Sequence, residues 1–240
     1  MQATKIFCDQ IDPIWQNGNL IRSEQNVDIW KIKVRDISSV SENILSNNER
    51  IKASRFLHTK DRVNFTCRRS ALRILLSRYI DIPPSEIEFI SGENKKPELS
   101  SELSKIRFNV SHSGELALIA ISDSPIGVDI ERIEPGFKYA DILKHSFSEL
   151  EISGIEQAAD SREVFFRLWT RKEALTKASS KGLDDDLSDI PCLNGWHSMN
   201  ENLIGLNGIW QLNSFSINAE YTGSIACIAD KKLNYLNFEF

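Results

Sequence analysis

The sequence lacks any long apolar segment. No stretch of the 240-residue chain reaches the roughly 18 consecutive apolar residues that a membrane-spanning helix requires. No charged segment followed by an apolar one stands near its start, as a secretory signal would. We therefore expect neither membrane insertion nor secretion, and a cytoplasmic protein.

The sequence also lacks an excess of positive charge and any clustered cysteines. Its net charge is −5, whereas a general nucleic-acid binder is normally basic. The cysteines stand far apart at positions 8, 67, 192 and 227, without zinc-site or redox-motif spacing, so we expect four reduced thiols. Hydrophobic content of 41% and charged content of 26% are ordinary for a globular protein of one large or two small domains.

The periodicity of apolar residues predicts strands and helices in alternation. The predicted strands are residues 27–34, 86–90, 106–110, 116–122, 127–132, 209–215 and 224–228. The predicted helices lie within residues 41–60, from Asp61 as a cap to about 79, 148–157 and 162–180, the last ending at Lys181-Gly182. The turn at residues 123–125 predicts that 116–122 and 127–132 pair as a hairpin.

A short internal similarity suggests two related lobes. Arg68-Arg69-Ser-Ala-Leu72 in one predicted helix resembles Arg171-Lys172-Glu-Ala-Leu175 in another, and a Ser-x-Ile segment follows each. We therefore expect a mixed α+β chain with two similar lobes, divided near residues 122–125, and a cleft between them.

The segment 127–132 carries two carboxylates on one face of a strand. Alternation directs the apolar residues at 126, 128 and 130 to a core and directs Gly127, Asp129 and Glu131 to the other side. Adjacent like charges repel, and their unpaired burial is costly. Such a pair indicates either an exposed acidic edge or a bound cation.

The long helix at 162–180 supplies a third carboxylate. Glu173 and Lys177 are four residues apart and share a face next to Trp169. They form either an ordinary exposed ion pair or a functional pair in which Glu173 converges on Asp129 and Glu131. Three oxygen donors with open positions suit Mg²⁺, and Lys177 would then stand one turn from a phosphate.

Several cations accompany these acids in the sequence. Taken singly, His112 is more often structural, Lys96 would be a solvated loop residue, and Arg68 and Arg69 a solvated helix face. Together with an acidic metal site they are typical of a polyphosphate ligand, whose phosphates take the cations and whose bridging metal takes the carboxylates.

Three motifs in series resemble one family. Phe108-Asn-Val-Ser-His-Ser113, Gly127-Val-Asp-Ile-Glu131 and Trp169-Thr-Arg-Lys-Glu-Ala174 with Lys177 resemble the long, pseudo-dimeric 4′-phosphopantetheinyl transferases of the surfactin-synthetase-activating and cyanobacterial type. Lys96-Pro97 matches the family's Gly-Lys-Pro loop, with Lys95 in place of the glycine. The resemblance covers roughly residues 50–183.

This resemblance implies a fold and an activity. The fold is two lobes in a pseudo-twofold arrangement, each a small antiparallel sheet with packed helices, and the active site lies in the cleft between them. We expect an N-terminal lobe, 1–123, with coenzyme A nucleotide contacts, and a C-terminal lobe, 124–240, with the Mg²⁺ site and catalytic helix. The activity is transfer of the phosphopantetheine arm of coenzyme A to a serine of an apo acyl or peptidyl carrier protein, releasing adenosine 3′,5′-bisphosphate.

The resemblance also implies residue roles. The metal ligands are Asp129, Glu131 and Glu173, and the catalytic residues are Glu173, Lys177 and Asp129. Glu173 acts on the carrier serine directly or through water, and Lys177 stabilises the leaving phosphate. The coenzyme A contacts are Arg69, Lys96, Ser111, His112, Lys172 and Lys177, with Arg68, Arg55 and Lys52 as weaker candidates.

The loop after the acidic strand is a candidate docking surface for the carrier. Phe137 and Tyr139 lie there, flanked by Lys138 and Lys144, and exposed aromatics near an active site often anchor interfaces. Equally, they could pack under the loop. Two lobes in one chain suggest a monomer.

Two other functions stay open at this point. One is a non-catalytic module that binds carrier proteins or nucleotides, against which the intact Glu173 and Lys177 argue. The other is a Mg²⁺-dependent nucleotide pyrophosphohydrolase, which would act without a carrier. No nucleic-acid or membrane partner is expected.

Overall fold

The fold is mixed α+β, as the sequence predicts. The computed structural model describes residues 3–18, 25–34, 42–92, 94, 96–100, 105–180 and 187–240. Lys95 and the predicted helix stop at Lys181-Gly182 lie outside these residues. Within them, no helix is long and apolar enough to cross a membrane.

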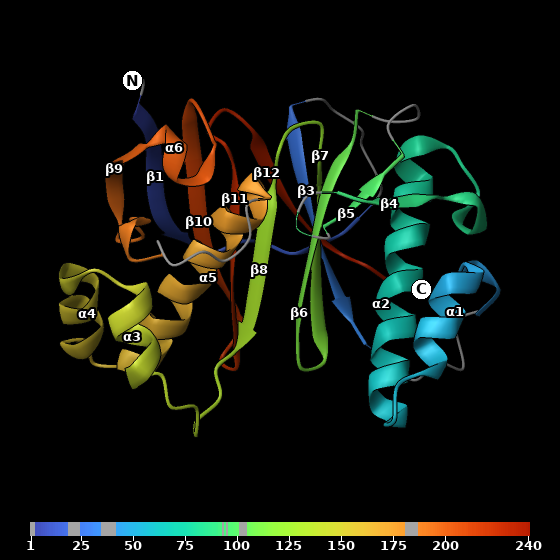
Figure 1. Ribbon diagram of the computed structural model, residues 1–240, viewed down its shortest axis with the longest axis horizontal. Coiled ribbons are helices and arrows are strands. Elements are labelled where there is room, and N and C mark those ends of the chain that lie inside the picture. The colour runs from blue at the N-terminus through green and yellow to red at the C-terminus, as the bar shows by residue number, and fades with distance from the viewer. Residues whose placement is uncertain are drawn as a thin grey trace.

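Two five-stranded sheets form the centre of the molecule (Figure 1). In order across the first sheet, the strands are β8 (Gly127–Arg132), β11 (Tyr221–Ile228), β10 (Ile209–Asn218), β1 (Ala3–Ile11) and β9 (Gly195–Asn200). Across the second they are β2 (Gln16–Asn17), β12 (Lys232–Asn237), β3 (Asn26–Lys33), β7 (Leu116–Ser122) and β6 (Arg107–Ser113). A short hairpin joins β4 (Phe89–Ser91) to β5 (Pro97–Leu99).

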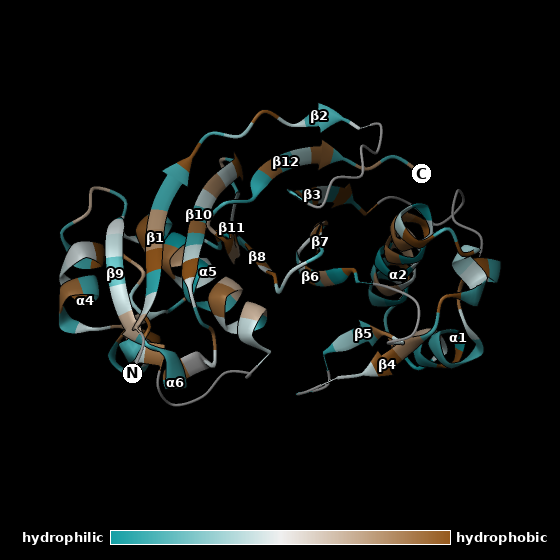
Figure 2. Ribbon diagram, turned by 90° about the horizontal axis from the view of Figure 1, so that it is seen from above, coloured by the Kyte–Doolittle hydropathy of each residue, from teal (hydrophilic) through white to brown (hydrophobic). Residues whose placement is uncertain are grey.

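Helices cover the outer face of each sheet, as Figures 1 and 2 show. The described helices are α1 (Asn47–Ser54), α2 (Thr59–Ile80), α3 (Ala140–Ser146), α4 (Glu149–Glu156), α5 (Ser161–Ser179) and α6 (Glu201–Ile204). Helix α2 packs on the second sheet and α5 on the first. Short 3₁₀ turns lie at Glu42–Ile44, Pro84–Glu86 and Leu187–Asp189.

The inner faces of the two sheets pack against each other. Alternation along β3 shows this: Val27 and Ile29 enter the core between the sheets, whereas Trp30 and Ile32 pack under α2. Strand β7 is buried along its whole length for the same reason. Both strands are therefore buried on two faces, as the almost wholly apolar segment 116–122 indicates for β7.

The two lobes exchange their terminal strands. Strand β1 pairs in parallel with β10 of the first sheet, and β12 pairs in parallel with β3 of the second. The predicted boundary at 123/124 falls in the turn between β7 and β8, but β1 and β12 each lie across it in the opposite sheet. Both sheets are thus mixed, since the first contains one parallel pairing and the second contains two, β12 with β3 and β12 with β2.

The predicted hairpin between residues 116–122 and 127–132 is wrong. Strand β7 pairs with β3 and β6, whereas β8 pairs with β11. The turn at 123–125 carries the chain from one sheet to the other, and Lys231 holds it through a 2.7 Å ion pair with Asp123. Local alternation cannot distinguish a hairpin from such a crossing, because it does not encode the pairing partner.

Candidate functional site

The site lies where the edge strands β6 and β8 face each other. The strands belong to different sheets, and polar side chains of β6 join them in steps of two residues. The backbone N–H groups of Val128, Ile130 and Arg132 donate to Asn109 Oδ1 (2.9 Å), Ser111 Oγ (3.4 Å) and Ser113 Oγ (3.0 Å), respectively. We call these three side chains of β6 the polar ladder.

Helix α5 approaches β8 closely at Gly127. A Cβ atom at this position would lie 1.9 Å from the backbone oxygen of Ala174 and 2.4 Å from the nitrogen of Ala178. The absent side chain therefore lets the helix backbone contact the strand. This packing places Glu173 and Lys177 beside the carboxylates of β8.

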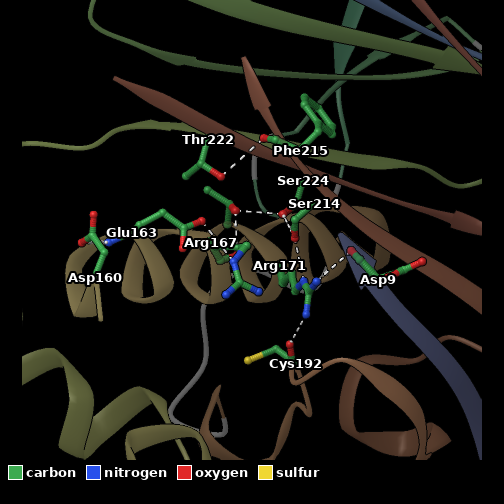
Figure 3. A network of polar contacts seen from close by, with 11 residues as sticks. Asp9, Asp160, Glu163, Arg167, Arg171, Cys192, Ser214, Phe215, Thr222 and Ser224 are labelled. Carbon is green, nitrogen blue, oxygen red and sulfur yellow. Dashed lines mark hydrogen bonds and ion pairs between the residues drawn. The ribbon is translucent and has the colours of Figure 1, made fainter. Parts of the chain in front are cut away.

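A buried arginine anchors α5 on its other side (Figure 3). The guanidinium of Arg171 is fully buried and donates to Ser214 Oγ at 2.6 Å. It also donates to the backbone oxygens of Cys192 and Asp9, each at 2.7 Å. The helix is thus tied to β10, β1 and the segment before β9, so the residues on its opposite face are held in place.

Asp129 is at the centre of the site. Its side chain is buried, and Oδ1 accepts hydrogen bonds from Ser111 Oγ at 2.7 Å and Lys177 Nζ at 2.6 Å. The hydroxyl of Ser111 also accepts from Lys177 at 3.1 Å. Side chains of β6, β8 and α5 therefore meet at Asp129.

Glu131 and Glu173 complete a group of mutually repelling carboxylates. Burial and then the charge of Asp129 raise the pKa of Glu131 to about 7, against opposing effects of Ser113, which donates to Glu131 Oε2 at 2.9 Å, and Lys177. Burial and the charge of Asp129, opposed by Lys177, likewise raise the pKa of Glu173 to about 7, with Glu131 adding to the rise. The three acids are therefore close enough to perturb one another.

The donor set fits a divalent cation in its chemistry. In the described part of the chain no three acidic, histidine or cysteine side chains stand close enough to hold an ion as they are placed. However, Asp129 Oδ2 is buried without a hydrogen-bond partner, which is unusual for a carboxylate oxygen. An unpaired oxygen with two further carboxylates nearby is the oxygen-rich environment that Mg²⁺ prefers.

Lys177, Arg68 and Asp129 all act electrostatically on His112, the histidine of the Phe108–Ser113 motif. Partial burial, then the charges of Arg68 and Lys177, lower the pKa of His112 to about 4, so the imidazole is neutral at pH 7. Arg69, which the sequence ranks above Arg68, instead pairs with Glu49 at 2.8 Å and stacks over Phe89. The structure thus favours Arg68 as the arginine beside His112.

Lys96 reaches the C-terminal end of α5. Its ammonium donates to the backbone oxygen of Lys177 at 2.7 Å, to Ser180 Oγ at 3.2 Å and to the oxygen of Ile126 at 3.5 Å. Asn94 donates to the oxygen of Ser180 at 2.8 Å. The β4–β5 loop therefore caps the C-terminus of α5, where a positive charge also complements the helix dipole.

Lys172 lies away from the site, contrary to its predicted role in phosphate binding. Its ammonium is fully buried, pairs with Glu151 at 2.9 Å and donates to the backbone oxygens of Leu187 and Ile190. Neighbouring helical residues point about 100° apart, so Lys172 and Glu173 cannot share one face. Lys172, the basic residue next to Glu173 in the chain, is therefore structural.

A cavity of about 540 Å³ opens between the lobes beside Lys96. Its lining includes Arg107 and Phe108 of β6, Ile126 before β8, and Ser180 at the end of α5. The volume is that of a small-molecule site, and the walls combine apolar surface with positive charge.

The sequence prediction missed the roles of Asn109 and Ser113. Both lie within the Phe108–Ser113 motif, but neither was assigned a contact. Their signal was the polar residue at every second position, 109, 111 and 113, which on a strand places all three on one face.

Comparison with known proteins places the chain in a family. Residues 125–226 match the 4′-phosphopantetheinyl transferase superfamily model, and residues 29–124 match the 4′-phosphopantetheinyl transferase, N-terminal model. The chain therefore belongs to the 4′-phosphopantetheinyl transferase family, of the type predicted from its motifs.

Curated relatives share this class. The 4′-phosphopantetheinyl transferase HetI of Nostoc sp. is 31% identical over 173 residues, covering 69% of this chain and 73% of HetI. The 4′-phosphopantetheinyl transferase Sfp of Bacillus subtilis is 33% identical over 141 residues, 58% of this chain and 62% of Sfp. The protein slr0495 of Synechocystis sp., whose name gives the same class, is 36% identical over 151 residues, 61% of each chain. The match thus spans about three fifths of slr0495 and Sfp.

Proposed function

We propose that this protein transfers the 4′-phosphopantetheine arm of coenzyme A to a serine of an apo acyl or peptidyl carrier protein. The observation that carries this proposal is the contact of Lys177 with Asp129, beside Glu131 and Glu173, at the junction of α5, β8 and β6. This junction brings one cation and three carboxylates together in a partly buried site. Family membership supplies the reaction class.

The transfer makes and breaks one bond to phosphorus. The carrier serine oxygen bonds to the phosphorus that bears pantetheine, and the bond from that phosphorus to the bridging pyrophosphate oxygen breaks, releasing adenosine 3′,5′-bisphosphate. The serine proton passes to Glu173 directly or through water. The raised pKa of Glu173, about 7, suits a base at neutral pH. Lys177 stabilises the charge on the leaving phosphate.

We further propose Mg²⁺ as the metal, held by Asp129, Glu131 and Glu173. The unpaired Asp129 Oδ2 supports this assignment, and the other two carboxylates must turn toward it to share an ion. When bound, Mg²⁺ would neutralise pyrophosphate charge and lower the pKa of its ligands. Glu173 would then be a weaker base, and it would orient the serine and receive its proton through a water molecule.

The nucleotide half of coenzyme A would occupy the cleft between the lobes. The cavity beside Lys96 supports this placement, as do Arg68 and the neutral His112, which can donate one hydrogen bond to a phosphate. Because one chain carries both lobes of the site, we propose that it acts as a monomer.

A mass measurement tests the activity. The protein is incubated with coenzyme A, Mg²⁺ and a panel of apo-carriers, and each carrier is weighed intact. We expect a gain of one phosphopantetheine, none with Glu173→Gln, and similar binding of coenzyme A by both proteins. Turnover of Glu173→Gln at the native rate would refute the role of this residue.

The same assay separates the other candidate functions. A pyrophosphohydrolase would release adenosine 3′,5′-bisphosphate when no carrier is present. A binding module would leave every carrier at its apo mass. Either result would overturn the proposed transfer.

The loop after β8 is the proposed carrier contact. Phe137 is 40% exposed although its ring packs on Phe166 at 5.6 Å, and Arg162 pins the loop by donating to the backbone oxygens of Glu134 and Phe137. Tyr139 is stacked on Phe165 with ring centroids 4.4 Å apart, so we assign it to stabilising the loop and not to contacting the carrier protein. The exposed Lys138 and Lys144 are the basic side chains beside this loop.

Replacing Phe137 tests the docking proposal. Phe137→Ala should raise the KM for carrier while leaving the KM for coenzyme A unchanged, because an apolar anchor is lost outside the nucleotide cleft. Phe56→Ala, at a 37% exposed phenylalanine of the other lobe, is the matched control. An unchanged carrier KM in Phe137→Ala would end the hypothesis.

A further inference from the structure

The polar ladder does more than join two strands. Two of its members, Ser111 and Ser113, lie two residues apart on β6 and face two carboxylates, Asp129 and Glu131, that lie two residues apart on β8. Each serine hydroxyl thus meets one carboxylate in register. The third member, Asn109, accepts from the backbone N–H of Val128, and among the described residues its side chain bonds to no carboxylate.

Each of the two hydroxyls is fixed in direction. Ser113 Oγ accepts from the backbone N–H of Arg132 at 3.0 Å, so its own proton is free to point to Glu131 Oε2 at 2.9 Å. Ser111 Oγ accepts from Ile130 and Lys177 and donates to Asp129 Oδ1. A hydroxyl that accepts on one side and donates on the other holds the orientation of the carboxylate that it contacts.

We propose that Ser113 is a positioning residue for Glu131 and thereby sets the affinity of the site for Mg²⁺. This inference rests on the proposed function. It means that strand β6 of one lobe organises carboxylates that belong wholly to the other. Ser113 touches neither coenzyme A nor the reacting atoms in this account, and it acts by holding one Glu131 oxygen so that the other is presented to the ion.

The expected size of the effect follows from the behaviour of groups that orient metal ligands. Their loss commonly weakens metal binding by about 10–100-fold. A carboxylate freed from its hydroxyl partner must be ordered when the ion binds, and the cost appears in the metal affinity. The affinity for coenzyme A without metal should stay within about twofold, because Ser113 makes no phosphate contact in this account.

The test measures Mg²⁺ binding by titration calorimetry on the full chain in the presence of coenzyme A, alongside melting temperature. Ser113→Ala should weaken Mg²⁺ about tenfold. Ser113→Thr keeps the hydroxyl and should bind within about threefold of the native chain. Asn109→Ala removes the hydrogen bond to the backbone of Val128 and does not disturb a carboxylate. This variant should therefore lower the melting temperature without changing the affinity for Mg²⁺.

The outcomes separate this inference from the proposed function. If the native chain binds no Mg²⁺ and modifies no carrier, the proposed function fails. If the native chain does both and Ser113→Ala binds Mg²⁺ equally well, the positioning role fails alone. If Asn109→Ala weakened Mg²⁺ binding as much as Ser113→Ala does, the polar ladder would act on the site only through the packing of the lobes. Should Ser113→Ala not fold, Ser113→Cys, similar in size but a weak donor, takes its place with the same expected loss.

Discussion

At the scale of single residues, the partners of Lys96 distinguish two roles that the sequence leaves together. A phosphate-binding lysine should present a solvated ammonium, whereas the ammonium of Lys96 bonds to three groups at the end of α5 and before β8. Burial lowers the pKa of Lys96 to about 8, as expected for a cation withdrawn from water. The side chain therefore acts on the helix that carries Lys177.

Lys96→Met should lower kcat more than it raises the KM for coenzyme A, because it loosens the helix end behind Lys177. The measurement compares coenzyme A with dephospho-coenzyme A. A helix cap predicts the same relative loss with both substrates. If Lys96 held the 3′-phosphate, the defect would disappear with the dephospho form, and that result would restore the role expected from the motif.

The raised pKa values of Glu131 and Glu173 predict a pH dependence. Both are about 7 in the fold against an ordinary 4.5. Between these values the folded chain holds more protons than the unfolded chain, so the free energy of unfolding should fall as pH rises from about 4.5 to about 7. A metal that requires both groups ionised should bind more tightly across the same interval.

The increase in melting temperature produced by Mg²⁺ should accordingly be larger at about pH 8 than at about pH 5.5. Scanning fluorimetry at fixed ionic strength measures it. Glu131→Gln should flatten the pH dependence. If Mg²⁺ raised the melting temperature of the native chain equally at both pH values, Glu131 and Glu173 would not be its ligands.

At the scale of elements, α5 has one face that anchors it to its neighbours and another that faces the carboxylates of β8. Lys172 and Arg171 are fully buried on the structural side, where they bond to Glu151 of α4 and to the backbones of β1 and the segment before β9. Glu173 and Lys177 project from the other side. A motif of consecutive residues is thus divided by helical geometry into an anchor and a site.

Lys172→Met tests this division. It leaves Glu151 buried without its cation, and loss of one partner of a buried ion pair costs roughly 3–5 kcal/mol of unfolding free energy. We expect that loss in urea denaturation, with an unchanged dissociation constant for coenzyme A in the protein that stays folded. Lys144→Met, at an exposed lysine of the same lobe, is the control. Native stability with weakened coenzyme A binding would contradict the structural assignment.

At the scale of the whole molecule, periodicity predicts most of the elements but not their pairing. Strands β3, β7 and β8 and helices α2 and α5 have apolar patterns strong enough to be recognised locally. Strand β1 was not predicted, because one of its buried positions is the polar Thr4 and the apolar Phe7 lies on the opposite face from Ile6 and Cys8. The exchange of β1 and β12 between sheets is a long-range choice that no local pattern records.

The candidate site was predictable in its acids and less so in its cations. The strand period places Asp129 and Glu131 on one face, and the helix period places Glu173 beside Lys177, whereas the grouping of the three acids came from the family resemblance. Long basic side chains reach partners that periodicity does not define: Lys172 pairs with Glu151, and Lys96 bonds to the end of α5. The contacts of Ser113 depend on an edge strand of another sheet, which only the fold supplies.

The central claim is that carboxylates from β8 and α5 share one divalent ion at the junction of the lobes. The most direct measurement is the anomalous scattering of Mn²⁺, used in place of Mg²⁺, in crystals of the native chain with coenzyme A. The account predicts a single peak at bonding distance from Asp129, Glu131 and Glu173. A peak elsewhere, or one that leaves Glu173 without contact to the ion, would contradict it.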